Sequence, residues 1–328
     1  MEEERKVKEI KEIKTEELDP EKFIKEKIEE IRRIVGKEKA IAALSGGVDS
    51  STTTMLAHRV LGEKLKVFFI DNGLMRQGKA EQVVSTFKLL GIHVGIVNAQ
   101  KEFFEALKGV TDPEEKREAI TQTFYRVVLA RLIRESGAKF LLHGTILTDI
   151  EETLAGIKRQ HNILEQLGIN TEKEYGYKVI EPLKQLRKDG VRKVAKALGL
   201  PKSIWNRMPF LGPALAGRII GEVTPEKVAL VRKATAIVEE ALKDSGAFQY
   251  MAILHEDRVT GMREGKREFG LQIEVRCWES VDARTATPTR LPYEILERLA
   301  KRITSEVSGV VSVTYNITPK PPSTMEAV

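Results

Sequence analysis

The chain has 328 residues, 41% of them hydrophobic, which is enough for two domains with buried cores. Its net charge of +6 suits anionic ligands such as nucleotides. The 54 basic residues are dispersed among 48 acidic ones, and no basic stretch carries interleaved aromatic residues, which argues against nucleic-acid binding. No apolar run approaches the ~18 residues of a membrane span, and the single cysteine, Cys277, excludes an intrachain disulfide. We therefore expect a cytoplasmic protein that binds neither nucleic acid nor a membrane.

Residues 1–18 are mostly charged or β-branched and lack an apolar face, which predicts an N-terminal arm or a frayed helix. Asp19 and Pro20 then form a typical helix start, because Asp is a favoured N-cap and Pro a favoured first residue. The apolar stripe that follows predicts a helix to about Val35, which Gly36 ends.

Residues 40–57 predict a strand, a glycine turn and a helix start. The apolar run from Ala40 to Leu44 is too short for a helix, and the two following glycines permit a tight turn. Asp49, Ser50 and Ser51 are then good N-cap residues for a helix with an apolar face. Amide N–H groups and the positive end of the helix dipole converge at such a turn, which predicts an anion site.

A plain turn between a strand and a helix also favours Gly and Ser. However, five of the seven residues from Ser45 to Ser51 are Ser or Gly, which is a denser set of donors than a turn requires. No Lys follows the glycines, and the G-x-G-x-x-G pattern is absent, so the loop is neither a Walker loop nor a dinucleotide fingerprint. Neutral donors suit a pyrophosphate that is held and then released.

The next segments alternate between short apolar runs and helical patterns. This alternation predicts an α/β fold with a doubly wound parallel sheet, whose strand ends face the ligand crevice. Residues 144–177 are polar and lack periodicity, which is typical of a lid. The predicted strands are 66–70, 93–98 and 139–143, and the predicted helices are 77–90, 113–136 and 191–198.

Beyond a Pro- and Gly-rich connector at 208–213 the pattern changes, which places a domain boundary there. We expect the first domain to span 19–207 and a smaller α+β domain to span 208–328. The second domain has predicted helices at 224–244 and 292–307 and predicted strands at 248–254, 269–278 and 310–317.

The loop Ser45-Gly46-Gly47-Val48-Asp49-Ser50-Ser51 resembles the pyrophosphate loop of the N-type ATP pyrophosphatases. Later segments resemble the GMP synthetase family in particular, occur in that family's order, and extend the likeness over roughly residues 19–326. The matching segments are Asp71 to Arg76, Gly144-Thr145-Ile146 with Asp149 and Glu152, Lys158 with His161 and Asn162, Glu181 to Lys184, Lys188-Asp189, Val191-Arg192, Pro209-Phe210, Gly212-Pro213, Gly221-Glu222-Val223, and the tail from Tyr315 to Glu326.

The resemblance implies three sets of site residues. The first would act in catalysis, the second would bind ATP, and the third would bind XMP. The catalytic set is Asp49, Lys158 and His161. The ATP set is Leu44, Ser45, Gly46, Gly47, Val48, Asp49, Ser50, Ser51, Ile70, Gly144 and Thr145. The XMP set is Arg76, Asp189, Lys320, Thr324 and Glu326.

Several of these residues have ordinary structural interpretations that the sequence leaves open. Asp49 either caps its helix or meets Mg²⁺ through water. Asp149 and Glu152 lie three residues apart and share a helix face, which suits Mg²⁺ or an ordinary acidic helix start. Arg76 could also be a surface residue, the pair Lys158 and His161 a solvated loop, and the residues from Lys320 to Glu326 a disordered tail.

The resemblance further implies a reaction. ATP adenylates the C2 oxygen of XMP and releases Mg-pyrophosphate, and ammonia then displaces AMP to give GMP. Only about 40 residues precede the loop, far below the size of a domain, and Cys277 lacks a nucleophile-elbow context. We therefore expect a separate glutamine amidotransferase subunit to supply the ammonia. The family also implies a homodimer through the second domain.

Two rival functions stay open at this point. Another amidating member, chiefly NAD synthetase, would share the loop but not the tail or the second domain, whereas a tRNA-thiolating enzyme would need a second cysteine. A non-catalytic regulatory subunit that binds nucleotide would keep the loop without turnover.

Overall fold

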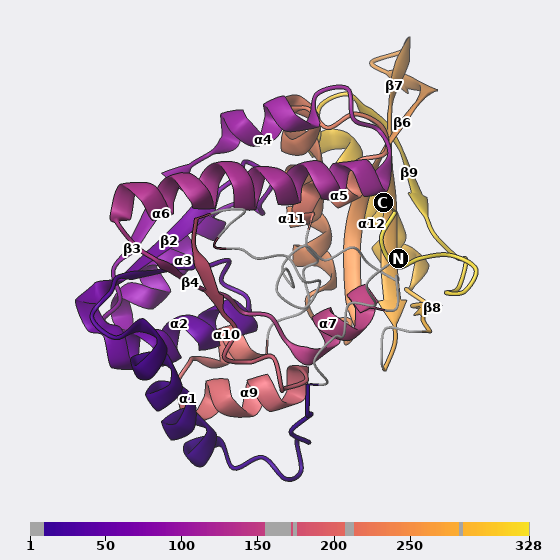
Figure 1. Cartoon of the computed structure of the whole chain (residues 1–328). Helices are drawn as coiled ribbons and strands as arrows, with labels where there is room; N and C mark the ends of the chain where they lie inside the picture. The colour runs from indigo at the N-terminus through magenta and orange to yellow at the C-terminus, as the bar shows by residue number, and fades with distance from the viewer. Residues whose placement is uncertain (1–9, 155–171, 173–175, 207–212, 282–284, 328) are drawn as a thin grey trace, which may run out of the picture. The chain divides into compact units, whose positions relative to one another are not determined.

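A computed structural model describes residues 10–154, 172, 176–206, 213–281 and 285–327 (Figure 1). The chain forms two compact units, each described by itself below. The first unit comprises Met1–Ile70, Ala80–Asn98 and Thr121–Arg207, and the second comprises Asp71–Lys79, Ala99–Ile120 and Met208–Val328. The expected domain boundary at 208–213 stays a proposal, because residues 207–212 lie outside the described residues and two earlier segments group with the second unit.

A five-stranded sheet forms the centre of the first unit. β1 lies in the middle and pairs in parallel with both β2 and β4, and β4 pairs in parallel with β5. β1 is almost fully buried, as its apolar sequence predicts. The expected α/β fold is therefore confirmed, with β5 as an additional strand. The sheet order is β3 (Val94–Asn98), β2 (Leu65–Asp71), β1 (Ala40–Ala43), β4 (Phe140–Leu142) and β5 (Lys178–Ile180).

Helices pack around this sheet, and their ends follow the sequence signals in most places. Asp19 caps α1, because its Oδ1 accepts hydrogen bonds from the amides of Glu21 and Lys22 at 3.0 and 3.1 Å. α1, α2 and α9 pack against one another. The helices of this unit are α1 (Pro20–Val35), α2 (Val48–Leu61), α3 (Lys79–Leu89), α6 (Ala130–Ser136), α7 (Leu147–Leu154), α9 (Lys188–Ala197) and α10 (Lys202–Trp205).

Two local expectations need correction, and a third is described only in part. α2 begins at Val48 with Gly47 as its N-cap, so Asp49 lies in the first turn and does not cap the helix. The single helix expected over 113–136 is α5 (Pro113–Gln122) and α6, joined by a π-helical stretch, Thr123–Leu129. Apolar periodicity does not reveal this change of winding. The segment expected to be a lid contains the helix α7 near its start, and most of its remainder lies outside the described residues, so the lid stays a prediction.

The second unit contains a four-stranded sheet, so the expected smaller α+β unit is confirmed. β6 and β7 form a long antiparallel hairpin, β8 pairs antiparallel with β7, and β9 pairs in parallel with β7. α11 packs on β6 and α12 on β9. The elements are α4 (Gln100–Leu107), most of α5, α11 (Pro225–Leu242), β6 (Gln249–Arg263), β7 (Lys266–Glu279), β8 (Thr287–Pro288), α12 (Tyr293–Glu306) and β9 (Val310–Tyr315). No helix among the described residues has both the length and the apolar character that a membrane crossing requires.

Candidate active site

The predicted phosphate loop connects the end of β1 to the start of α2. Gly46 has a φ of 73°, a conformation that favours glycine. The Ser45 Oγ lies 3.0 Å from the Ser50 Oγ and accepts a hydrogen bond from the Gly47 amide at 3.2 Å. Ser45 is exposed, and Gly47 and Ser50 are half-buried. The loop is thus an open turn, stabilised by hydroxyl groups, at the N-terminus of a helix whose cap has no side-chain hydrogen bond.

The end of β4 lies against this loop, as the parallel sheet predicts. A Cβ atom at Gly144 would lie 2.9 Å from both the Asp49 carbonyl carbon and the Ser50 nitrogen. Only glycine allows such an approach of two backbones. The structure therefore brings Gly144 together with the residues of the phosphate loop.

Thr145, the next predicted ATP residue, is fully buried and belongs to a chain of hydrogen bonds. Its Oγ1 donates to the Glu181 carboxylate at 2.7 Å and lies 2.8 Å from the His143 Nδ1. Because the Thr145 proton goes to Glu181, the His143 Nδ1 must carry the proton that Thr145 accepts. The His143 Nε2 then accepts from the Tyr125 hydroxyl, 2.8 Å away.

Burial sets the charge state of this chain. It lowers the pKa of His143 to about 4, so the imidazole is neutral at physiological pH. Burial also raises the pKa of Tyr125, and the nearby Tyr177 and Glu181 add to this effect. The chain from Tyr125 to Glu181 is therefore a fixed set of donors and acceptors that orients the segment carrying Gly144.

A lysine to which the sequence pattern assigned no role lies beside the phosphate loop. The Lys188 Nζ is 2.5 Å from the Asp49 Oδ2, and 42% of the Lys188 side chain is exposed. The pair is 139 residues apart in sequence, and α9 begins at Lys188, three residues earlier than its periodicity predicts. The cradle is therefore not purely neutral, because a cation from another helix lies at its edge.

Asp49 has one oxygen in this ion pair and a second that is available for other contacts. Its Oδ1 is buried and has no hydrogen-bond partner among the described residues. Ser51, in contrast, is fully buried, and its amide donates to the Gly47 carbonyl at 3.1 Å. Neither the hydroxyl nor the amide of Ser51 therefore faces the open side of the loop.

The remaining predicted residues of the first unit differ in exposure. Leu44 and Ile70 are buried, and the Leu44 amide donates to the Phe68 carbonyl at 2.8 Å. Val48 opens α2 and is buried too. Asp189 is exposed and accepts from Arg192 one turn later at 3.0 Å.

The predicted lid residues are described only in part. Asp149 accepts from the Ile146 amide at 3.0 Å, which is a helix-start contact. Lys158, His161 and the Glu152 side chain lie outside the described residues.

Two predicted XMP residues of the second unit are held by neighbours. The Arg76 guanidinium forms an ion pair with Glu239 at 2.8 Å. Lys320 is bonded through its backbone to Ala286, with N–H to O distances of 2.8 and 3.1 Å. The first contact holds the Arg76 side chain, and the second holds the Lys320 main chain.

The end of the tail is largely buried. Glu326 is 7% exposed and lies close to Gly217, since a Cβ there would be 3.4 Å from the Glu326 Oε2. The adjacent Arg218 is fully buried. Burial lowers the pKa of Arg218, whereas the charges of Glu326 and Glu239 act in the opposite direction. The sequence did not single out Arg218, because a buried arginine looks like any other in the primary structure.

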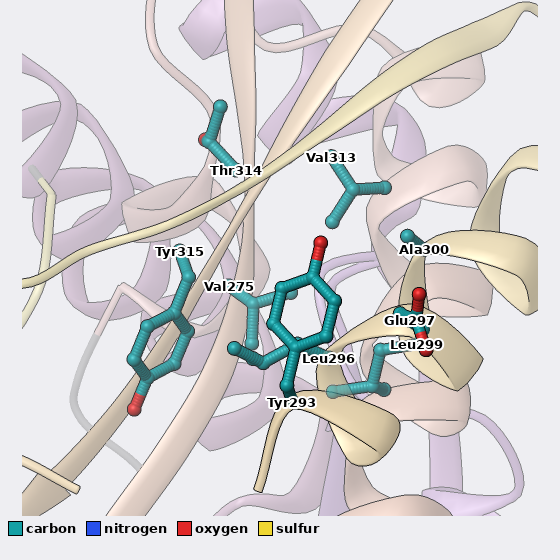
Figure 2. A pocket seen from close by; sticks show the side chains of 9 residues that line it. All are labelled: Val275, Tyr293, Leu296, Glu297, Leu299, Ala300, Val313, Thr314 and Tyr315. Carbon is teal, nitrogen blue, oxygen red and sulfur yellow. The ribbon is translucent and has the colours of Figure 1, made fainter. Parts of the chain in front are cut away.

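The second unit also has a pocket of about 200 Å³ between α12, β7 and β9 (Figure 2). It is mostly apolar, with Leu296, Leu299 and Val313 among its lining residues and Glu297 as its carboxylate. None of its lining residues belongs to the predicted site sets. It is therefore distinct from the predicted ATP and XMP residues.

The fold and the loop define an α/β nucleotide-binding protein of the ATP-pyrophosphatase class. The family model described as asparagine synthase matches residues 31–264, and the model described as GMP synthase C terminal domain matches residues 236–327.

Individual relatives narrow this assignment. The chain is 51% identical to the B subunit of the glutamine-hydrolysing GMP synthase of Archaeoglobus fulgidus, over 94% of the chain and 99% of the relative. Identity to the corresponding B subunits of Pyrococcus furiosus and Methanopyrus kandleri is 50% and 48%, over 93% and 94% of the chain and 97% and 99% of those relatives. The chain belongs to the family of glutamine-hydrolysing GMP synthase B subunits. The resemblance seen in the sequence is thereby confirmed.

Proposed function

We propose that this chain catalyses the ATP-dependent amination of XMP to GMP. The C2 oxygen of XMP attacks the α-phosphorus of ATP, which forms an adenyl ester and releases pyrophosphate. Ammonia then adds at C2, AMP leaves with the former C2 oxygen, and loss of a proton gives the amine of GMP. The observation that carries the proposal is the match to GMP synthase B subunits over nearly the whole chain.

The phosphate loop is the proposed site for the β- and γ-phosphates of ATP. Amides at the start of α2 and the hydroxyls of Ser45 and Ser50 supply neutral donors. Lys188 supplies a positive charge that offsets the charge developing on the departing pyrophosphate. Leu44, Ile70 and Gly144 would line the adenosine side. In this proposal catalysis consists mainly of positioning and charge stabilisation.

Mg²⁺ fits this site through Asp49. The buried Asp49 Oδ1 lacks a hydrogen-bond partner among the described residues, and a carboxylate oxygen is a ligand that Mg²⁺ favours. When bound, the ion would neutralise phosphate charge. The described residues contain no group of three or more His, Cys, Asp or Glu side chains that could hold a metal alone. This fits an ion held by one carboxylate and the phosphates.

We assign XMP to Arg76, Asp189 and the tail residues Lys320, Thr324 and Glu326. Lys320 would meet the nucleotide phosphate, and Thr324 and Glu326 the base or ribose. We infer that Lys158 and His161 act in catalysis, either by neutralising the charge of the leaving pyrophosphate or by guiding the incoming ammonia.

The partners are also part of the proposal. The relatives are named as B subunits, so we infer that a separate glutaminase subunit delivers ammonia. A homodimer through the second unit and a cytoplasmic location complete the assignment.

The decisive experiment supplies the purified chain with ATP, Mg²⁺, ammonium and XMP. We expect GMP, AMP and pyrophosphate in equal amounts. Turnover of nicotinate adenine dinucleotide in place of XMP would support an NAD synthetase, and nucleotide binding without turnover would support a regulatory role. Glutamine should not replace ammonium until the glutaminase is added.

A further inference from the structure

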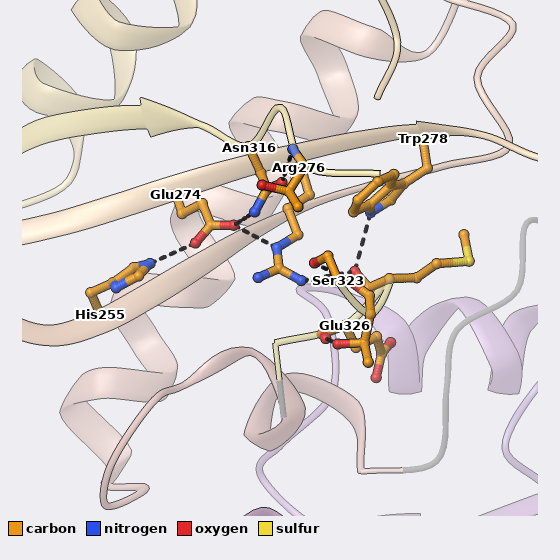
Figure 3. Close-up of polar contacts among 10 residues, drawn as sticks. His255, Glu274, Arg276, Trp278, Asn316, Ser323 and Glu326 are labelled. Carbon is orange, nitrogen blue, oxygen red and sulfur yellow. Dashed lines mark hydrogen bonds and ion pairs between the residues drawn. The ribbon is translucent and has the colours of Figure 1, made fainter. Parts of the chain in front are cut away.

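Arg276 of β7 lies against the main chain of the C-terminal tail. Its side chain is only 9% exposed. The Arg276 Nη1 donates to the Thr324 carbonyl at 2.8 Å and lies 3.5 Å from the Met325 carbonyl. The Trp278 Nε1 donates to the same Met325 carbonyl at 3.1 Å (Figure 3). Two side chains of one strand therefore bind consecutive carbonyls of the tail.

A carboxylate holds the other side of the Arg276 guanidinium. The Glu274 Oε1 lies 2.5 Å from the Arg276 Nε and accepts from the Asn316 Nδ2 at 2.8 Å. The Glu274 Oε2 lies 2.7 Å from the His255 Nε2. Residues 274, 276 and 278 alternate along β7 and so share one face of the sheet. This face carries an ordered row from His255 to the tail (Figure 3).

The row is charged although it is buried. Burial raises the pKa of Glu274, but hydrogen bonds from His255, Arg276 and Asn316 outweigh it and lower the pKa to about 2. Burying an ion pair gains little stability over apolar packing. Apolar packing is already present, because the Met325 side chain packs in a cluster with Trp278 and Ala286. The ion pair therefore orients the main chain of the tail, because a planar guanidinium that is itself held in place fixes the position of the carbonyls it binds.

The bonded carbonyls belong to Thr324 and Met325. Thr324 is itself assigned to the purine nucleotide, and Met325 directly precedes Glu326, which has the same assignment. We propose that Arg276 is a positioning residue for the purine nucleotide, which it serves by fixing the main chain that carries Thr324 and Glu326. This inference rests on the proposed XMP role of the tail. Arg276 acts through the tail and makes no contact with the substrate itself.

Tryptophan fluorescence gives a test that does not depend on turnover. The chain has two tryptophans, so Trp205→Phe leaves Trp278, which touches the tail, as the only reporter. In that background Arg276→Met should shift the Trp278 emission as the tail is released. In steady-state assays the KM for XMP should rise about tenfold or more, the effect of losing hydrogen bonds from a charged group. The KM for ATP should stay within about twofold, and Arg276→Lys should recover only part of the XMP affinity.

Arg302→Met is the matched control. Arg302 lies on α12 and forms ion pairs with Glu306 and Glu240 at 2.7 and 3.0 Å. The substitution removes the same charge at a position that does not bind the tail. It should change neither the Trp278 emission nor the KM for XMP.

The outcomes separate the inference from the proposed function. Unchanged emission in Arg276→Met overturns the anchoring role. Shifted emission with an unchanged KM for XMP overturns the purine role of the tail, and with it the positioning role. If Arg276→Met does not fold, Trp278→Phe decides, because it removes one bond to the Met325 carbonyl and leaves the ion pair intact. A raised KM for XMP in that variant supports the inference, and an unchanged one contradicts it.

Discussion

The phosphate loop and the C-terminal tail are held in opposite ways. The loop is half-open, and it is shaped by serine hydroxyls and by one ion pair whose Lys188 reaches solvent. The tail is tied down by buried charges, with Glu274 and Arg276 each 9% exposed. The comparison teaches that the loop leaves Ser45 exposed and Ser50 half-buried, within reach of a ligand, whereas the main chain of the tail is held by buried side chains of β7. Variants in the loop should therefore affect turnover first, and variants in the network behind the tail should affect stability first.

The largest expected effect is on turnover, from Lys188→Met. Loss of the cation beside the loop should lower kcat for GMP formation by about 10²–10³-fold, the range for removing one group that stabilises developing charge. Initial rates at saturating ATP, XMP and ammonium measure it. Lys193→Met is the control, since Lys193 lies on the same helix and donates to the Thr15 carbonyl. A loss of less than about threefold in Lys188→Met would remove Lys188 from the site.

His143 should show the second effect, on stability and its pH dependence. The folded pKa of about 4 lies below the unfolded value of 6.5, so the unfolded chain binds more protons between these values. Stability should therefore fall by about 3 kcal/mol as pH drops from 6.5 to 4. Urea unfolding across this range measures the slope.

Two variants at this position sharpen the test. His143→Gln keeps one donor and one acceptor and should remove the slope at a modest loss of stability. His143→Leu leaves Tyr125 and Thr145 without their shared partner and should cost about 2–3 kcal/mol at neutral pH. Equal stability of the two variants would contradict the hydrogen-bond chain.

Glu274 tests the tail side of the comparison in a different pH range. Its folded pKa of about 2 lies below the usual 4.5, so its stabilising effect is present above 4.5 and is lost as pH falls toward 2. Glu274→Gln should lower the free energy of unfolding at neutral pH by about 2–3 kcal/mol, and the difference from the unmodified chain should shrink below about pH 4. A difference that is constant with pH would show that Glu274 is not held as a carboxylate.

Gly144→Ala should give the smallest of these effects, about 1–3 kcal/mol of stability, as overpacking usually does. The added methyl would press on the backbone of Asp49 and Ser50, so ATP affinity should fall as well. Gly190→Ala is the control, because its nearest contacts are ordinary ones at 3.4–3.5 Å. Calorimetric ATP titration of both variants measures the difference, and equal affinities would place Gly144 outside the loop's support.

Much of the fold could be predicted because its signals are local. Asp19 and Pro20 indicated the start of α1, and the short apolar run at Ala40 indicated the central strand. The approach of Gly144 to the loop also follows from sequence, since parallel strands end at the same edge.

What could not be predicted depends on contacts between distant segments. Lys188 pairs with a residue 139 positions away, and no periodicity encodes that meeting. The burial of Thr145 and Ser51 is a property of packing, so both looked like open donors. The π-helical stretch that presents Tyr125 to His143 has the same apolar spacing as an ordinary helix.

The distance between Asp49 and Lys188 has a consequence for how the protein is made. The ribosome releases β1 and its loop well before α9, because Lys188 is synthesised 139 residues after Asp49. Domains generally fold as units as they emerge. A nascent chain arrested before α9 should therefore carry the loop sequence without its lysine, so nucleotide capture would begin only late in translation.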